Sequence, residues 1–188
     1  SEWSIVRISQ DEWYENWEKV VKATMIQSWE YGEAKKSQGW NPQRYGIVNE
    51  DDRVVGILQI MLKTLPFIGG VARINRGPLF LQGNELGDEQ EKTLSNLLLA
   101  MHKFCKEERI WLLSWAPEYH MENSYHDILK KHGHVANDRA NPWGSILLDI
   151  QVSEDSIFTG LNGKWRNLLR KAQKLNNDIR SVKDMDGI

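Results

Sequence analysis

The sequence predicts an α+β fold whose sheet is mixed, mostly antiparallel and flanked by helices. Residues 44–48 and 53–62 are rich in β-forming side chains and are joined by the polar turn 49–52, which is typical of an antiparallel hairpin. Residues 88–107 instead place apolar side chains at helical spacing. The apolar run 111–115 then suits a buried central strand. Strands followed by a long helix and a further strand indicate an α+β domain.

Two helices are predicted before the hairpin. A short strand at residues 6–8 leads to Ser9 and Glu12, which form a capping-box signature for a helix reaching about Ala23. Ser28 caps a second short helix that runs through residue 36. The chain therefore begins with a strand and a helix pair.

The remaining elements of the first part follow from turn residues and apolar periodicity. A third strand at 71–75 ends at Arg76-Gly77-Pro78. Residues 123–131 suit a helix that stops at Gly133, and residues 145–150 suit another strand. We therefore predict one domain over residues 1–150.

The tail has a different pattern. Ser153 begins a helical run to residue 161, and residues 164–175 form a second helix with one apolar stripe. Residues 178–182 have the composition of a strand start. Residues 151–188 are therefore expected to be a helical connection and the start of a truncated second domain. The opposite side of the second helix carries a basic face: Arg166, Arg170, Lys171 and Lys174.

Composition limits the class of protein. Apolar residues make up 40% and charged residues 27%, which is typical of a globular chain. The net charge of −2 means that any contact with a polyanion must come from a local patch. Cys105 is the one cysteine, so no internal disulfide is possible, as in a reducing compartment. Without a leader pattern or a bilayer-length apolar run, we expect a cytoplasmic protein.

Three stretches, taken in order, resemble the FemABX family of aminoacyltransferases. The first is residues 27–35, QSWEYGEAK, followed by Gly39-Trp40. The second is Arg76-Gly77-Pro78 at a strand end, and the third runs from residues 147–149 through Ser153-Glu154 to residues 164–172, KWRNLLRKA. Family members are built from two tandem GNAT-like domains, so the resemblance implies a GNAT-like sheet here.

The resemblance also implies a function. The family transfers an amino acid from aminoacyl-tRNA to a nucleotide- or lipid-linked muropeptide precursor, with no cofactor. This chain would be the acceptor-binding half, inactive by itself, because the donor would bind largely in the second domain. One position departs from the pattern: where members often carry Asp-Pro after the central strand, this sequence has Ala116-Pro117-Glu118. The carboxylate that could act as a general base is therefore displaced or absent in this half.

Family motifs and loop positions indicate the binding residues. By the family pattern, Lys35 would reach the acceptor's diphosphate at the mouth of an anion-receiving groove, with Lys36 beside it. Arg76 would line the same groove from its strand end, or Gly77-Pro78 after it are only turn residues. Arg139 and Trp143 would line the groove because they lie in the irregular stretch 137–144. The basic face of residues 166–174 would meet tRNA phosphates or the acceptor's negative charge, or would be only the solvated side of an amphipathic helix.

Other chemistries have less support in the sequence. The closest matches to an acetyl-CoA phosphate loop, residues 43–48 and 53–58, lack the last small residue and lie in predicted strands. His102 and Cys105 do not make a closed metal site, and Cys105 is expected to be an inert buried thiol. Two alternatives stay open: an N-acyltransferase that uses acyl-CoA or a carrier-bound acyl group on a small molecule, and a non-catalytic module that binds a muropeptide or a partner.

Overall fold

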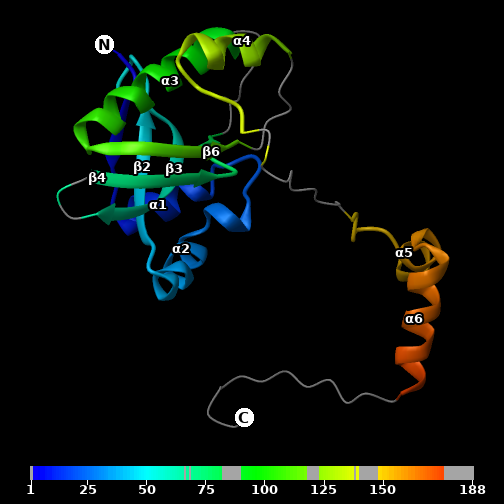
Figure 1. Ribbon diagram of the computed structural model, residues 1–188. Helices are drawn as coiled ribbons and strands as arrows, with labels where there is room; N and C mark the ends of the chain where they lie inside the picture. The colour runs from blue at the N-terminus through cyan, green and yellow to red at the C-terminus, as the bar shows by residue number, and fades with distance from the viewer. Residues whose placement is uncertain are drawn as a thin grey trace. The chain divides into compact units, whose positions relative to one another are not determined.

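The computed structural model describes residues 2–65, 67, 69–81, 90–117, 123–137, 139 and 148–175. The chain divides into two compact units, residues 1–137 and residues 138–188, which are described separately (Figure 1). A truncated second domain at residues 151–188 stays a prediction. Within the described residues, no helix has both the length and the apolar composition needed to span a bilayer.

The first unit is built on a mixed, mostly antiparallel six-stranded sheet. Its path runs β1-β2-β3-β4-β6, and β5 pairs with β3. All pairs are antiparallel except β4–β6. The predicted α+β class, the hairpin and the third strand are confirmed. The strands are β1 (Ser4–Arg7), β2 (Asn41–Val48), β3 (Val54–Leu65), β4 (Gly69–Asn75), β5 (Leu79–Phe80) and β6 (Ile110–Ala116).

Helices lie on both faces of this sheet (Figure 1). On one face, α1 (Gln10–Trp17) packs Trp13 against Ile57 of β3. The short α2 (Trp29–Lys35) lies on the same face and is flanked by the 3-10 turns η1 (Met25–Gln27) and η2 (Lys36–Gln38). On the other face, α3 (Gln90–Glu107) packs against the next residue of β3, Leu58, and α4 (Asn123–Lys131) packs against α3.

The larger apolar core lies between the sheet and α3. Leu97 of α3 and Ile47 of β2 are fully buried, and the ring of Tyr45 meets that of Phe104 at 4.7 Å between centroids. Burying each such side chain contributes about 1.5–3 kcal/mol. This core covers only one face of β4 and β6. The opposite face of these strands is either covered by other elements or exposed to solvent.

One predicted helix end and one predicted strand burial were wrong. The helix that begins at Ser9, whose capping box is confirmed, ends at Trp17 and not near Ala23. It ends early because Val20 leaves the helix to pair with Leu81 as an isolated β-bridge. The strand at 110–116 is not buried on both sides: Trp111 is 74% exposed and Leu112 60% exposed. β6 is the last strand on the sheet path, and α3 covers only one of its faces.

The second unit contains two capped helices. Ser153 caps α5 (Glu154–Gly160), and Asn162 caps α6 (Gly163–Lys174), as the pattern of the tail predicts. The predicted strand at 145–150 lies mostly outside the described residues, and its last three residues are not in a strand. The predicted strand start at 178–182 lies outside them entirely.

Cys105 provides a test of the core. Its thiol packs against the α3 side of the core, and burial raises its pKa to about 11. At pH 8 the folded protein should therefore react with iodoacetamide on the order of 100-fold more slowly than the unfolded chain, whose thiol pKa is about 8.5. The reaction is run with and without urea, and mass spectrometry of quenched samples measures both rates. Equal rates would contradict the packing of Cys105 in the core.

Candidate active site

A buried glutamine joins two strands where they stop pairing with each other. The last β3–β4 pair is Met61 with Arg73, so Gln59 and Asn75 lie just beyond it. Gln27 of η1 fills this position: its Nε2 donates to the carbonyl of Asn75 at 2.7 Å and to that of Gln59 at 3.2 Å. Its Oε1 accepts from the N–H of Gln59 at 2.8 Å. The side chain thus replaces the missing strand-to-strand hydrogen bonds.

The side chain of Gln59 connects β3 to the start of α2. It is buried, and its Nε2 donates to the carbonyl of Ser28 at 3.0 Å. Ser28 also caps α2 by accepting from the N–H of Tyr31 at 3.1 Å. Gly32 packs directly over the two polar side chains below, because a Cβ on it would overlap Gln59 and would lie 2.6 Å from Nη2 of Arg44. Only glycine allows α2 to approach the sheet this closely.

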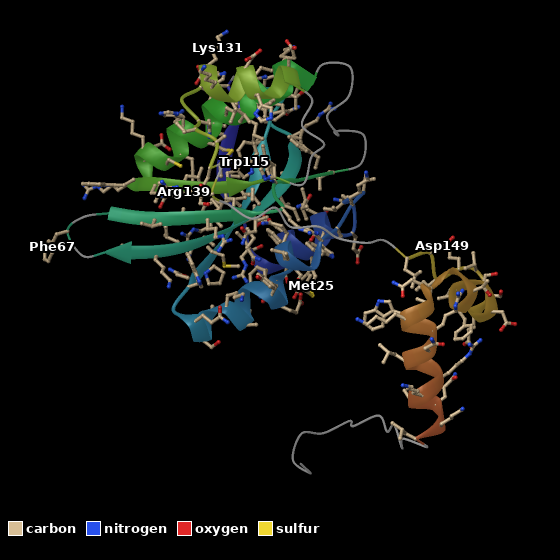
Figure 2. All side chains as sticks on the ribbon, turned by 45° about the vertical axis from the view of Figure 1, so that its right-hand side comes forward. Met25, Phe67, Trp115, Lys131, Arg139 and Asp149 are labelled. Carbon is tan, nitrogen blue, oxygen red and sulfur yellow. The ribbon has the colours of Figure 1, made fainter. Side chains whose placement is uncertain are left out.

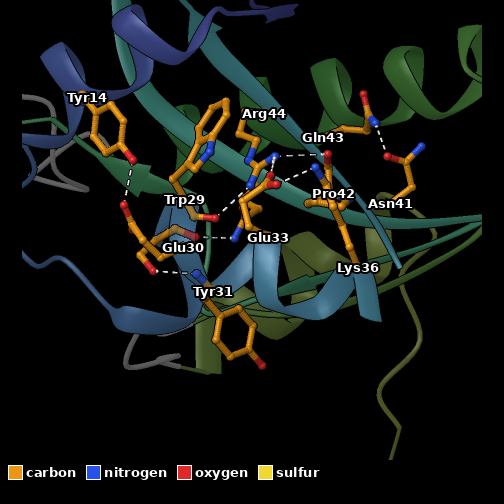
Figure 3. A network of polar contacts seen from close by, with 12 residues as sticks. Tyr14, Trp29, Glu30, Tyr31, Glu33, Lys36, Asn41, Pro42, Gln43 and Arg44 are labelled. Atoms are coloured by element: carbon orange, nitrogen blue, oxygen red, sulfur yellow. Dashed lines mark hydrogen bonds and ion pairs between the residues drawn. The ribbon is translucent and has the colours of Figure 1, made fainter. Parts of the chain in front are cut away.

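Arg44 of β2 holds the flank of α2 that carries Trp29 and Glu33 (Figure 3). Its guanidinium is only 7% exposed, donates from Nη2 to the Trp29 carbonyl at 2.9 Å, and stacks 3.9 Å from the ring centroid of Trp29. Nη1 pairs with a carboxylate oxygen of Glu33 at 2.9 Å. Burial lowers the pKa of Arg44, while hydrogen bonds from Lys36 and Arg44 lower the pKa of Glu33. The lowered pKa of Glu33 favours its ionised form.

These contacts set the rotation of α2 and separate its two lysines. At about 100° per residue, Lys35 lies about 60° from Gly32, on the side opposite Trp29 and Glu33. Since Trp29 and Glu33 contact Arg44 of β2, this flank lies on the side of α2 away from Arg44. Lys35 is half-buried; its Nζ donates to Oε1 of Gln38 at 3.0 Å and lies 5.2 Å from the Tyr31 ring centroid.

Lys36 has a different environment from that of Lys35. Its Nζ forms an ion pair with Glu33 at 2.5 Å, so Lys36 shares with Arg44 a carboxylate that offsets part of its charge. Among the described residues, no carboxylate lies within ion-pair distance of Lys35. Of the two predicted lysines, Lys35 is therefore the one with positive charge available to a ligand.

The flank with Lys35 adjoins a part of the sheet that we call the open face. It consists of exposed side chains on the α2 side of β3, β4 and β6, beyond the edge of α2. Their common side follows from the register, because Arg73 pairs with Met61 and Ser114 pairs with Arg73, while Leu113 and Trp115 pack on the α3 side. The members of the open face are Lys63, Arg73, Leu112 and Ser114.

Arg76 lies at the far end of the open face. It has a left-handed backbone with φ of 53°, is half-buried, and donates its N–H to the carbonyl of Ala116 at 2.7 Å. Trp115, labelled in Figure 2, donates from Nε1 to the carbonyl of Gly77 at 2.6 Å. The ends of β4 and β6 thus bring Arg76 beside Ala116.

Lys35 and Arg76 occupy opposite ends of this surface. The carbonyl of Lys35 accepts from the N–H of Trp40 at 3.4 Å, and Lys63 lies over the Trp40 ring. Lys63 pairs with Val71, and Arg76 follows β4 five residues later. At ~3.3 Å per residue, the two ends are separated by roughly 16 Å along the strand.

The other predicted binding residues belong to the second unit, and some lie outside the described residues. Arg139 is an exposed residue of the second unit, and Trp143 lies outside the described residues. On α6, Arg166 donates to the carbonyl of Thr159 at 2.7 Å, and the guanidinium of Arg170 lies 5.2 Å from the ring of Phe158. Half of the basic face is therefore bound to α5, while Lys171 and Lys174 are exposed.

Comparison with known proteins identifies the fold of the chain. A structure of FemX superimposes with a TM-score of 0.64 at 19% identity, covering 91% of this chain and 44% of FemX. An acetyltransferase of Trypanosoma brucei gives a TM-score of 0.45 at 10% identity, covering 77% of this chain and 100% of its own. No curated protein sequence matches the chain. The fold is therefore that of the FemX structure, of which this chain spans less than half.

The family follows from the sequence match. Residues 8–140 match the profile of the FemAB family. The chain belongs to the FemAB family. The matched region includes the open face, Arg76 and the residues that hold α2 on the sheet, namely Gln27, Gly32, Arg44 and Gln59.

The attachment of α2 to the sheet can be tested at Arg44. Arg44→Lys keeps the positive charge but loses the planar fork that reaches both Trp29 and Glu33. We expect the free energy of unfolding to fall by about 1–3 kcal/mol. Urea denaturation measures it, with Arg53→Lys in the exposed turn before β3 as the matched control. Equal stability of the two variants would show that Arg44 does not hold α2.

Proposed function

We propose that this chain is the acceptor-binding part of an aminoacyltransferase that transfers an amino acid from aminoacyl-tRNA to a peptidoglycan precursor. Membership of the FemAB family supports the proposal. The observation that carries it is the environment of Lys35: a half-buried ammonium on the flank of α2, beside the open face, with no carboxylate partner among the described residues. Such a group is suited to a phosphate of a nucleotide- or lipid-linked muropeptide.

The reaction requires positioning more than covalent catalysis by the protein. An amine of the acceptor attacks the ester carbonyl of the donor, a C–N bond forms, the tRNA hydroxyl leaves, and the amine loses a proton. Holding both reactants in place accounts for much of the rate in such a step. Lys35 would anchor the acceptor, and Arg76 would contact its far end. Ala116 offers no carboxylate, so we assign the base to a group other than residue 116.

The remaining assignments belong to the same proposal. The protein would act in the cytoplasm, where nucleotide-linked precursors and aminoacyl-tRNA are found. Lys36 would add to the positive potential near Lys35, and Arg139 and Trp143 would line the acceptor site. The basic face of α6 would contact tRNA phosphates, chiefly through Lys171 and Lys174, since Arg166 and Arg170 contact α5.

One observation favours a second candidate. Ala116 lies next to Arg76 at the strand ends, where family members often have aspartate. If that carboxylate is essential to transfer, the chain would be a module that binds a muropeptide without acting on it. Both functions require the same acceptor site.

Calorimetric titration with a nucleotide-linked muropeptide tests the acceptor site. Lys35→Ala should weaken binding about tenfold, which corresponds to the loss of one charge-assisted contact of about 1.4 kcal/mol. Lys106→Ala, which removes an exposed lysine of α3 on the other side of the sheet, is the control and should bind as the unaltered protein does. If Lys35→Ala binds with unchanged affinity, Lys35 is not part of the acceptor site.

A further inference from the structure

Lys63 and Arg73 place two further cations on the open face. They lie on neighbouring strands: Lys63 pairs directly with Val71, and Arg73 is the next residue of β4 on the same side. Residues related diagonally in this way have Cα atoms about 7–8 Å apart, within reach of two long side chains. Both are exposed, and neither was predicted as a binding residue from the sequence.

The contacts of both side chains hold them without neutralising them. The Nζ of Lys63 lies 4.5 Å from the ring centroid of Trp40, a position in which the π face attracts a cation. Nε of Arg73 donates to the amide oxygen of Asn75 at 2.9 Å, which uses one of its five N–H groups. Within the described part of the chain, neither residue has a carboxylate within ion-pair distance.

Three other cations of the first unit are ion-paired. Lys19 pairs with Glu15, Lys36 pairs with Glu33, and Arg44 pairs with Glu33. Lys63, Arg73 and Lys35 instead have no carboxylate within ion-pair distance among the described residues. A surface of uncompensated cations, with the two on the sheet held by an aromatic ring and an amide, is typical of an anion-binding site.

We propose that Lys63 and Arg73 form a second anion-binding position, which holds a negatively charged group of the acceptor in addition to the group held by Lys35. This inference rests on the proposed acceptor-binding function. The shared chemistry is an oxyanion, either a phosphate of the nucleotide or a carboxylate of the peptide. Arg73 supplies a planar fork for it, and Lys63 a point charge. Two anion contacts constrain the orientation of an acceptor more than one contact does.

Charge removal at constant length tests the position. Lys63→Gln and Arg73→Gln should each weaken binding of a nucleotide-linked muropeptide roughly three- to tenfold, the range for one exposed charge contact. The loss should shrink as NaCl is raised, because salt screens exposed charges. Lys103→Gln, an exposed lysine of α3 across the sheet, is the matched control. Lys63→Arg should restore most of the affinity, which a purely structural role of the Lys63 amine would not predict.

The choice of ligand distinguishes the two sources of negative charge. If the glutamine variants also weaken binding of free uridine diphosphate, the position holds a phosphate; if they weaken only the muropeptide complex, it holds a peptide carboxylate. Unchanged affinity for both ligands, with Lys35→Ala still impaired, would overturn the second position and leave the proposed function standing. Unchanged affinity in the Lys35, Lys63 and Arg73 variants alike would overturn both.

Discussion

The placement of α2 depends on one buried amide. Gln27 occupies the gap where β3 and β4 stop pairing, and it satisfies backbone groups of both strands. Left without partners, each of these buried groups would cost about 1–3 kcal/mol. Because Gln27 precedes α2 by only two residues, the hydrogen bonds that complete the sheet also fix the start of the helix.

Polar contacts beneath α2 fix its orientation more closely than apolar contacts would. α2 has seven residues, too few to be stable without tertiary contacts. An apolar stripe would allow small rotations, but the directional bonds from Gln59 and Arg44 allow essentially one. Gly32 lets the helix come close enough for those bonds. The rotation, in turn, directs Lys36 toward Glu33 and leaves Lys35 on the flank away from Arg44. A structural network on one side of a short helix thus determines which lysine is available on the other.

The sequence predicted the elements whose signals are local. Capping residues such as Ser9, Ser28 and Ser153 act within one turn, and the hairpin follows from two runs and a turn. The end of α1 was wrong because Val20 pairs with Leu81, which is distant in sequence. The burial of β6 was wrong because an apolar run does not reveal whether both faces of a strand are covered.

The candidate site was only partly predictable for the same reason. The family pattern indicated Lys35 and Arg76, but it did not show that Gln27 and Gly32 of the same motif are structural. Arg44 and Gln59 are polar residues within strands, and such residues are usually expected to face solvent. Lys63 and Arg73 become neighbours only through the β3–β4 register. A signal was present in the alternation of the paired strands, but it can be interpreted only once the pairing is known.

Native-state hydrogen exchange tests directly whether α2 is held on the sheet by this buried network. If it is, the amide of Gly32, bonded to the Ser28 carbonyl, should exchange with nearly the same opening free energy as the amide of Gln59, bonded to Gln27. In Gly32→Ala the α2 amides should lose protection while those of β3 outside the Gln27 contact keep it. Rapid exchange of α2 in the unaltered protein, with Gln59 fully protected, would show that the helix opens independently and would contradict the account.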